Sequence, residues 1–262
     1  MNITMTNRQG KTLSVTVSGQ ENAPVIIFSN SLGTDKNMWQ PQVVALEQQF
    51  KVVTYDTRGH GQSDVIEHTT LQNLAEDVID ILNGLNIEKA HFCGISMGGI
   101  TALWLGIYHA DRFLSITVAN SAAKIWTTDG WNTRADAVIQ NGLADLVTTT
   151  HSRWFSERFD YQHNALAQRT IQSLAVTPAA GYAESCRALA QADLTAEIKN
   201  IHIPTLIIAG AFDPVTTVAD GIFMQQQIQG SELVEIEASH LSNIEQPELF
   251  NQTFIKFVES VQ

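Results

Sequence analysis

The sequence is poor in cysteine and has no long hydrophobic run, and each shortage excludes a class of protein. Its only two cysteines among 262 residues, Cys93 and Cys186, lie far apart and lack the spacing of a metal site. A disulfide framework is therefore not expected, and a reducing cytoplasm is the simplest setting. No apolar segment approaches the roughly 20 residues that cross a bilayer. The N-terminal stretch MNITMTNRQGKTL also lacks the apolar centre of a signal peptide, so we expect a soluble, cytoplasmic protein.

Positive charge is also scarce. The chain has 15 basic residues against 27 acidic ones, which gives a net charge of −12. Such a balance argues against nucleic acid and anionic membranes as partners. It does not exclude a small anionic substrate, because the field of distant charges is screened over roughly 8 Å and one local cation can outweigh it.

Strand-like and helix-like segments alternate along most of the chain. Short β-rich runs occur at LSVTVSG, APVIIFS, KVVTYD, AHFCGIS and FLSITVAN, and residues 71–87 have apolar positions at helical spacing. This alternation predicts an α/β fold with a mostly parallel central sheet flanked by helices. Residues 121–194 lack strand signals and contain three helical candidates, TRADAVIQNGL, HNALAQRTIQSLA and AGYAESCRALAQ. The alternation resumes with PTLIIAG and ELVEIE. We therefore expect a core of residues 1–120 and 195–262 with a helical cap, residues 121–194, inserted into it.

A candidate nucleophile lies between a predicted strand and a predicted helix. Gly94-Ile95-Ser96-Met97-Gly98 matches the pattern G-x-S-x-G. In this context the pattern is typical of a nucleophile elbow, in which the serine sits at the apex of a strained turn. The two glycines fit because neighbouring backbone comes close to the serine and leaves little room for a β-carbon. Ser96 is the predicted nucleophile.

The base, and the carboxylate that orients it and stabilises its cation, are chosen by their positions at strand ends. His240 follows the strand ELVEIE, and Asp213 follows PTLIIAG. Catalytic groups of open parallel sheets gather at the carboxyl ends of strands, and the order Ser, Asp, His is the one expected for a nucleophile-elbow enzyme. His60, in the turn Asp56–Ser63, also follows a strand and is the one serious competitor. We interpret that turn as structural, because it lacks both phosphate-binding glycine patterns.

An acyl-transfer enzyme also needs two backbone N–H groups directed at the developing oxyanion. Met97, which follows the nucleophile, supplies the first. The stretch VIIFSNSLG, an apolar strand that runs into a short polar loop, provides the second. We assign it to Leu32 and expect this loop to present backbone rather than side chain to the substrate.

Several motifs together resemble one enzyme family. They are SNSLGTDKNMW, DTRGHGQSD, GISMGG, NSAAKI, RWF, TPAAGY, IIAGAFDPVT and SHLSNIEQPELF. The chain resembles the 3-oxoadipate enol-lactone hydrolases of bacterial aromatic catabolism over nearly its whole length. The resemblance implies an α/β-hydrolase fold and the triad Ser96, Asp213 and His240, in agreement with the residues chosen above. Asn30 is one of the discriminating features of this resemblance, because most α/β-hydrolases have the histidine of a His-Gly oxyanion loop at this position.

The implied reaction is the opening of 3-oxoadipate enol-lactone to 3-oxoadipate through an acyl-enzyme on Ser96, with no cofactor and no metal. The substrate is a small anion, and its carboxylate needs a partner in an apolar pocket. We favour Arg134 as that partner over Lys124, because a guanidinium suits a bidentate contact, and Trp131 as the pocket wall. The alternatives are a carboxylesterase, a carbon–carbon bond hydrolase of ring-cleavage products and, from a different class, a non-catalytic ligand-binding module. The sequence carries no signal for an oligomeric state.

Overall fold

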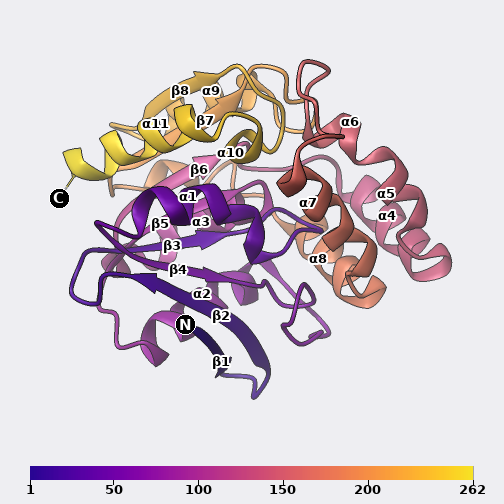
Figure 1. Ribbon diagram of the computed structural model, residues 1–262, viewed down its shortest axis with the longest axis horizontal. Helices are drawn as coiled ribbons and strands as arrows, with labels where there is room; N and C mark the ends of the chain where they lie inside the picture. The colour runs from indigo at the N-terminus through magenta and orange to yellow at the C-terminus, as the bar shows by residue number, and fades with distance from the viewer. Residues whose placement is uncertain (262) are drawn as a thin grey trace.

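A twisted eight-stranded sheet forms the centre of the computed structural model, which describes residues 1–261 (Figure 1). The strand order is β1-β2-β4-β3-β5-β6-β7-β8. The first two pairings, β1 with β2 and β2 with β4, are antiparallel, and all others are parallel. The strands are β1 (Asn2–Thr6), β2 (Thr12–Gly19), β3 (Val25–Ser29), β4 (Lys51–Tyr55), β5 (Ala90–Ile95), β6 (Phe113–Ala119), β7 (Thr205–Gly210) and β8 (Glu232–Ile236).

Burial along the strands explains why they read as continuous apolar runs. Every residue of β5 and β7 is buried, as expected for central parallel strands covered on both faces. At the two edges, β1 and β8 keep exposed positions. The edge strand β1 precedes the first strand expected from the sequence, and its alternation of exposed and half-buried residues gives little hydrophobic signal.

Helices cover the sheet and pack against it. They are α1 (Gln40–Leu46), α2 (Leu71–Gly84), α3 (Met97–Tyr108), α9 (Val218–Gln227), α10 (Ser242–Glu245) and α11 (Pro247–Ser260), with short 3₁₀ turns η1 (Lys36–Trp39), η2 (Ala110–Arg112) and η3 (Ile198–Asn200). Helix α2 begins with a capping box between Thr70 and Asn73, which satisfies two backbone donors at the helix start. Within residues 1–261, no helix combines the length and the apolar character that a membrane crossing needs.

Five helices lie between β6 and β7 in the sequence and gather at one side of the molecule (Figure 1). They are α4 (Thr128–Asn141), α5 (Ala144–Thr149), α6 (His151–Trp154), α7 (Ala165–Val176) and α8 (Ala179–Gln191). The longer three coincide with the helical segments expected from the sequence. The short helices α5 and α6 were not expected, because six and four residues are too few to show a helical period. Division of the chain at residues 121 and 194 stays a prediction.

Two glycine contacts hold these helices close to the core. Gly59 has a φ of +75°, and a β-carbon built on it would lie 2.5 Å from the Cα of Gly181 in α8. A β-carbon on Gly33 would lie 2.7 Å from Leu174 and 3.2 Å from Tyr182. Only glycine allows such an approach, so the TPAAGY segment packs directly on the two core loops that contain Gly33 and Gly59.

Candidate active site

Ser96 occupies a strained turn between β5 and α3. Its φ of 57° and ψ of −113° are unfavourable for a residue with a side chain. The flanking glycines make the turn possible: a β-carbon on Gly94 would lie 2.0 Å from the carbonyl oxygen of Gly98, and one on Gly98 would lie 2.2 Å from that of Ser29. The hydroxyl therefore projects at the carboxyl end of the sheet, where the helix N-terminus begins.

His240 and Asp213 meet at the same end of the sheet. Asp213 follows β7, His240 follows β8, and Nδ1 of His240 lies 2.8 Å from Oδ2 of Asp213. Both residues are buried. Because the ionised carboxylate only accepts hydrogen bonds, it favours the tautomer in which Nδ1 carries the proton and Nε2 has the lone pair. That tautomer is the one a general base needs.

The Asp213 carboxylate is held by several further donors. Its Oδ1 accepts hydrogen bonds from the backbone N–H groups of Val215 and Thr216, at 2.8 and 3.1 Å. Its Oδ2 accepts from the Thr216 hydroxyl and from Nδ2 of Asn120, at 2.9 and 3.1 Å. Burial raises the pKa of the Asp213 carboxyl, but the neighbouring His240 and these donors outweigh it, so the pKa lies below its usual value. The carboxylate therefore stays ionised and fixed in orientation.

Asn120 is a residue that the sequence reasoning missed. It follows β6 with a φ of 42°, is fully buried, and also donates from Nδ2 to the Ser239 carbonyl oxygen, 3.0 Å away. Its Oδ1 accepts a hydrogen bond from the Ser242 hydroxyl. Asn120 thus joins Asp213 to the loop that carries His240. Its place at the carboxyl end of a strand is the signal that selected Asp213, so the same reasoning could have found it.

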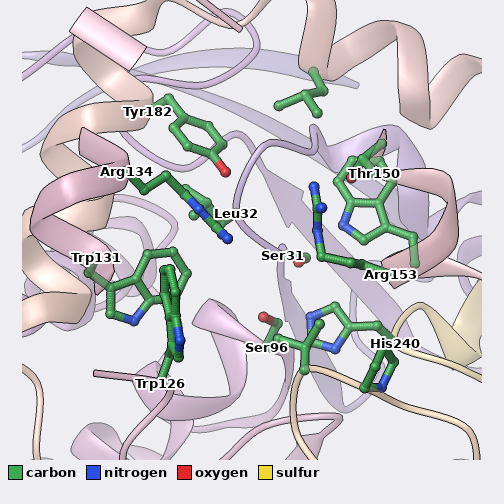
Figure 2. Close-up of a pocket in the computed structure, with 14 residues that line it drawn as sticks. Ser31, Leu32, Ser96, Trp126, Trp131, Arg134, Thr150, Arg153, Tyr182 and His240 are labelled. Carbon is green, nitrogen blue, oxygen red and sulfur yellow. The ribbon is translucent and has the colours of Figure 1, made fainter. Parts of the chain in front are cut away.

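A cavity of about 220 Å³ opens over Ser96 and His240 (Figure 2). Of the residues predicted from the sequence, Ser96, His240, Leu32, Trp131 and Arg134 line it. Asp213 lies behind His240, and the Met97 side chain is buried in the core. A cavity of this size and mixed lining suits a small molecule with one polar end.

The loop that carries Leu32 is fixed by its own polar side chains. Asn30 accepts a hydrogen bond on Oδ1 from the indole N–H of Trp39 at 3.0 Å and donates from Nδ2 to the Tyr55 carbonyl oxygen at 2.8 Å. The Asn30 carbonyl oxygen in turn accepts the N–H of Gly98 at 3.0 Å. These bonds tie the loop after β3 to the turn that holds Ser96, and they explain the asparagine in the Ser-Asn-Ser-Leu-Gly stretch. The roles of the Leu32 and Met97 N–H groups stay predictions.

His60, the competitor for the role of base, supports the same loop from behind. Its Nε2 accepts the backbone N–H of Gly33 at 3.0 Å, and its Nδ1 lies 3.1 Å from the Arg58 carbonyl oxygen. Because Nε2 accepts, Nδ1 must be the donor. Burial lowers the pKa of the His60 imidazole, so the neutral form is favoured. Both ring nitrogens are occupied by backbone groups, and His60 has no free nitrogen to serve as a base.

Arg134 extends from α4 into the cavity beside two indole rings. Its guanidinium carbon lies 4.7 Å from the ring centre of Trp126 and 5.0 Å from that of Trp131. The two rings are nearly perpendicular and their centres are 5.4 Å apart, so both lie toward one side of the guanidinium and leave its other side open to the cavity. Lys124, the other cation considered, forms an ion pair with Asp193 at 2.8 Å and does not line the cavity.

Arg153 of α6 is a second cation in the cavity, and the sequence reasoning did not select it. Figure 2 shows Arg134 and Arg153 extending into the cavity from opposite walls. The motif RWF contains Arg153, but a four-residue helix shows no period that could indicate which way its side chains point. Only the packed structure identifies this residue as part of the site.

The fold and the arrangement of these residues define a class of protein. A family model described as the alpha/beta hydrolase fold matches residues 24–247, and the chain belongs to that family. More particularly, it is 72% identical over 260 residues to 3-oxoadipate enol-lactonase 1 of Acinetobacter baylyi. This match covers 99% of this chain and 98% of that relative. The resemblance indicated by the sequence motifs is thereby confirmed.

Solved structures share the same fold at lower sequence identity. The enol-lactonase from Burkholderia xenovorans superimposes with a TM-score of 0.93 at 38% identity, covering 95% of this chain and 97% of that one. A thermophilic esterase from Thermogutta terrifontis superimposes with a TM-score of 0.92 at 25% identity, covering 100% and 99%. Sequence identity separates the two more clearly than backbone similarity does, so the fold alone does not select the substrate.

Proposed function

We propose that this chain is a serine hydrolase that opens 3-oxoadipate enol-lactone to 3-oxoadipate in the catabolism of aromatic compounds. The observation that carries the proposal is the 72% identity to a 3-oxoadipate enol-lactonase over nearly the full length of both chains. The cavity over Ser96 and His240, with a cation in its wall, supports the same substrate class. We further propose a cytoplasmic location and a cap formed by residues 121–194.

Acylation follows from the proposed roles. Nε2 of His240 takes the proton of the Ser96 hydroxyl as Oγ attacks the lactone carbonyl carbon. The carbonyl oxygen becomes an oxyanion, which the N–H groups of Leu32 and Met97 stabilise. Such donors typically contribute about 3–4 kcal/mol each to lowering the barrier. Asp213 stabilises the imidazolium that forms.

Ring opening and deacylation complete the cycle. Collapse of the oxyanion breaks the bond between the carbonyl carbon and the ring oxygen, and the ring oxygen leaves as an enolate. An enolate is a better leaving group than a simple alkoxide, so proton donation by His240 matters less here than in amide hydrolysis. Transfer of the proton held by the His240 imidazolium to the enolate carbon gives the ketone, which can no longer reclose the ring, and returns His240 to its neutral form. His240 then activates a water molecule that releases 3-oxoadipate and restores the Ser96 hydroxyl.

We propose that Arg134 binds the substrate carboxylate while Trp131 forms the adjacent wall. Both indole rings lie toward one side of the guanidinium, and no carboxylate within residues 1–261 pairs with it, so its N–H groups can make a bidentate contact with a bound carboxylate. An Arg134→Ala change should raise the KM for the enol-lactone and spare neutral esters. Equal losses on both substrates would remove Arg134 from this role.

The decisive experiment compares wild type with Ser96→Ala on synthetic enol-lactone and on p-nitrophenyl acetate. The proposal expects wild type to prefer the lactone and Ser96→Ala to lose at least about 10⁴-fold in kcat. Ser152→Ala is the matched control, because Ser152 is an exposed serine on α6 outside the cavity over Ser96. A wild-type preference for the plain ester would favour a carboxylesterase. Absence of a fluorophosphonate adduct on Ser96 would favour a binding module.

A further inference from the structure

Arg153 lines the cavity but has no role in the function proposed above. It comes from α6, on the wall opposite Arg134, and its side chain is half-buried in the cavity over Ser96 (Figure 2). Its only side-chain hydrogen bond within residues 1–261 is a long one, 3.4 Å from Nη1 to the Thr149 hydroxyl. Most of its five N–H donors therefore have no protein partner.

The two cavity arginines differ from other partly or fully buried cations of the core. Arg58 is paired with Asp77 at 2.7 Å, and Lys36 is paired with Asp56 at 2.7 Å. Throughout residues 1–261, by contrast, neither Arg134 nor Arg153 has a carboxylate within ion-pair distance. An unpaired, partly desolvated charge is costly.

The two positive charges also act on each other. Burial lowers the pKa of the Arg153 guanidinium, and the positive charge of Arg134 lowers it further. In a chain with a net charge of −12, two unneutralised cations that share one small cavity form a local site of opposite sign. An anion that binds between them would relieve both costs.

The backbone around Arg153 is bound to the loop that carries His240. The carbonyl oxygen of Arg153 accepts from the Ser239 hydroxyl at 3.3 Å, and that of Trp154 accepts from the N–H of Leu241 at 3.0 Å. Glu245 accepts the N–H groups of both Ser239 and Ser156, at 2.9 and 3.1 Å. The position of Arg153 is therefore set relative to His240, and an anion held by Arg153 has a fixed place relative to the reacting groups.

We propose that Arg153 is a second specificity-determining residue, which clamps the substrate carboxylate from the side opposite Arg134. This inference rests on the proposed function, because it assigns the charged arm of the enol-lactone to the two arginines. A carboxylate has about four acceptor sites, enough for two guanidinium groups. The clamp selects lactones that carry the acidic arm and holds their ring carbonyl over Ser96.

The test compares two lactones that differ only in that arm. α-Angelica lactone has the same ring and the same enol leaving group as 3-oxoadipate enol-lactone, with a methyl group in place of the carboxymethyl group. For Arg153→Gln, we expect kcat/KM for the charged lactone to fall about 10- to 100-fold, the range of a lost charged hydrogen bond. The value for α-angelica lactone should stay within about twofold. Arg158→Gln is the matched control, because Arg158 follows α6, is exposed and stacks on Phe212 outside the cavity.

Two outcomes would overturn the inference. Equal losses on both lactones would place Arg153 against the leaving group or in a structural role, not against the carboxylate. Unchanged kcat/KM on both would show that Arg153 does not contact the substrate. A wild-type enzyme that leaves the charged lactone intact would instead overturn the proposed function, so the two failures are distinguishable.

Stability and coupling measurements separate a clamp from a structural arginine. Because removing Arg153 relieves charge repulsion, Arg153→Gln should unfold at a temperature equal to or above that of wild type. Its stabilisation by added 3-oxoadipate should be smaller than that of wild type. In the double variant Arg134→Gln, Arg153→Gln, the loss on the charged lactone should be smaller than the product of the single losses, because both residues hold one carboxylate. A lower melting temperature together with fully multiplicative losses would contradict the clamp.

Discussion

The carboxyl end of the sheet and the helices above it contribute to one cavity in different ways. Ser96, Asp213 and His240 each follow a strand, so the sheet itself sets their positions. Arg134 and Arg153 come from separate helices, α4 and α6, and their positions depend on how those helices pack. The first set carries the proposed chemistry, which needs fixed geometry. The second carries the proposed selectivity, which can change with the packing of a few side chains.

The same comparison bears on neighbours that share this fold. The thermophilic esterase superimposes nearly as well as the enol-lactonase, with TM-scores of 0.92 and 0.93. A sheet that presents a nucleophile and a base serves any ester. We infer that the substrate is chosen by the residues that the helices between β6 and β7 place over Ser96.

The largest expected effect is a difference in kcat between variants of two buried histidines, His240 and His60. His240→Gln should lower kcat by at least about 10⁴-fold, because it removes the proposed base. His60→Gln should lower kcat less than about tenfold, since it alters one hydrogen bond behind the Leu32 loop. Steady-state kinetics on the enol-lactone measures both. A larger loss from His60→Gln than from His240→Gln would exchange their roles.

A strand end can be located from the sequence, and so can a residue that follows it. The apolar runs before Ser96, Asp213 and His240 locate three strand ends, and parallel pairing brings those ends to one edge. Position after a strand does not by itself separate His60 from His240, because both follow strands. The difference lies in their partners, a carboxylate for His240 and backbone groups for His60, and such contacts exist only after folding.

The helical insertion shows where sequence reasoning stops. Its periodic segments predict three helices. The periodicity of a helix does not indicate which end of the core that helix covers. Trp131 and Arg134 were selected for their chemistry, and both line the cavity. Arg153 has the same chemistry as Arg134 and was not selected, because no pattern distinguished it from arginines at the surface.

The glycine contact between α8 and the core offers the next test. Gly181→Ala would place a β-carbon 2.2 Å from the carbonyl oxygen of Gly59, so α8 must move away or the loop must shift. We expect a loss of about 1–3 kcal/mol in unfolding free energy and a higher KM for the enol-lactone. Ala180→Ser is the control, since Ala180 is exposed on the same helix. Unchanged stability and KM in Gly181→Ala would show that the helices tolerate displacement from the core.

Acid should destabilise the protein partly through His60. Because burial lowers the folded-state pKa of His60 below its usual value of 6.5, the unfolded chain binds a proton that the folded chain does not. Its contribution is therefore complete above pH 6.5 and is lost as the pH falls below that value, by up to about 1.4 kcal/mol per pH unit. His60→Gln keeps an acceptor for the Gly33 N–H but does not titrate. Unfolding by denaturant at pH 7 and pH 5 should show a smaller acid loss in this variant, whereas equal losses would contradict the assignment.

The smallest expected effect concerns the contact between Trp126 and Arg134. It tests whether substrate binding depends on the orientation of the Arg134 guanidinium as well as on its charge. Trp126 is half-exposed at the cavity, and its ring centre lies 4.7 Å from the guanidinium carbon of Arg134. Trp126→Leu keeps a β-carbon at this strained position, φ 57°, and leaves the contact between Arg134 and Trp131 in place. A lost cation–π contact of about 0.5–1 kcal/mol predicts a two- to fivefold rise in KM for the enol-lactone, with kcat and the hydrolysis of α-angelica lactone unchanged.

Trp104→Leu is the control for this change, because Trp104 stacks on Tyr108 away from the cavity. A fall in kcat for Trp126→Leu would mean that the stacked arginine contributes to the reacting geometry itself. Arg134, which contacts two tryptophans and lies on a helix rather than at a strand end, would then contribute to catalysis as well as to selectivity. The division of roles between the sheet edge and the helices would be incomplete at this residue.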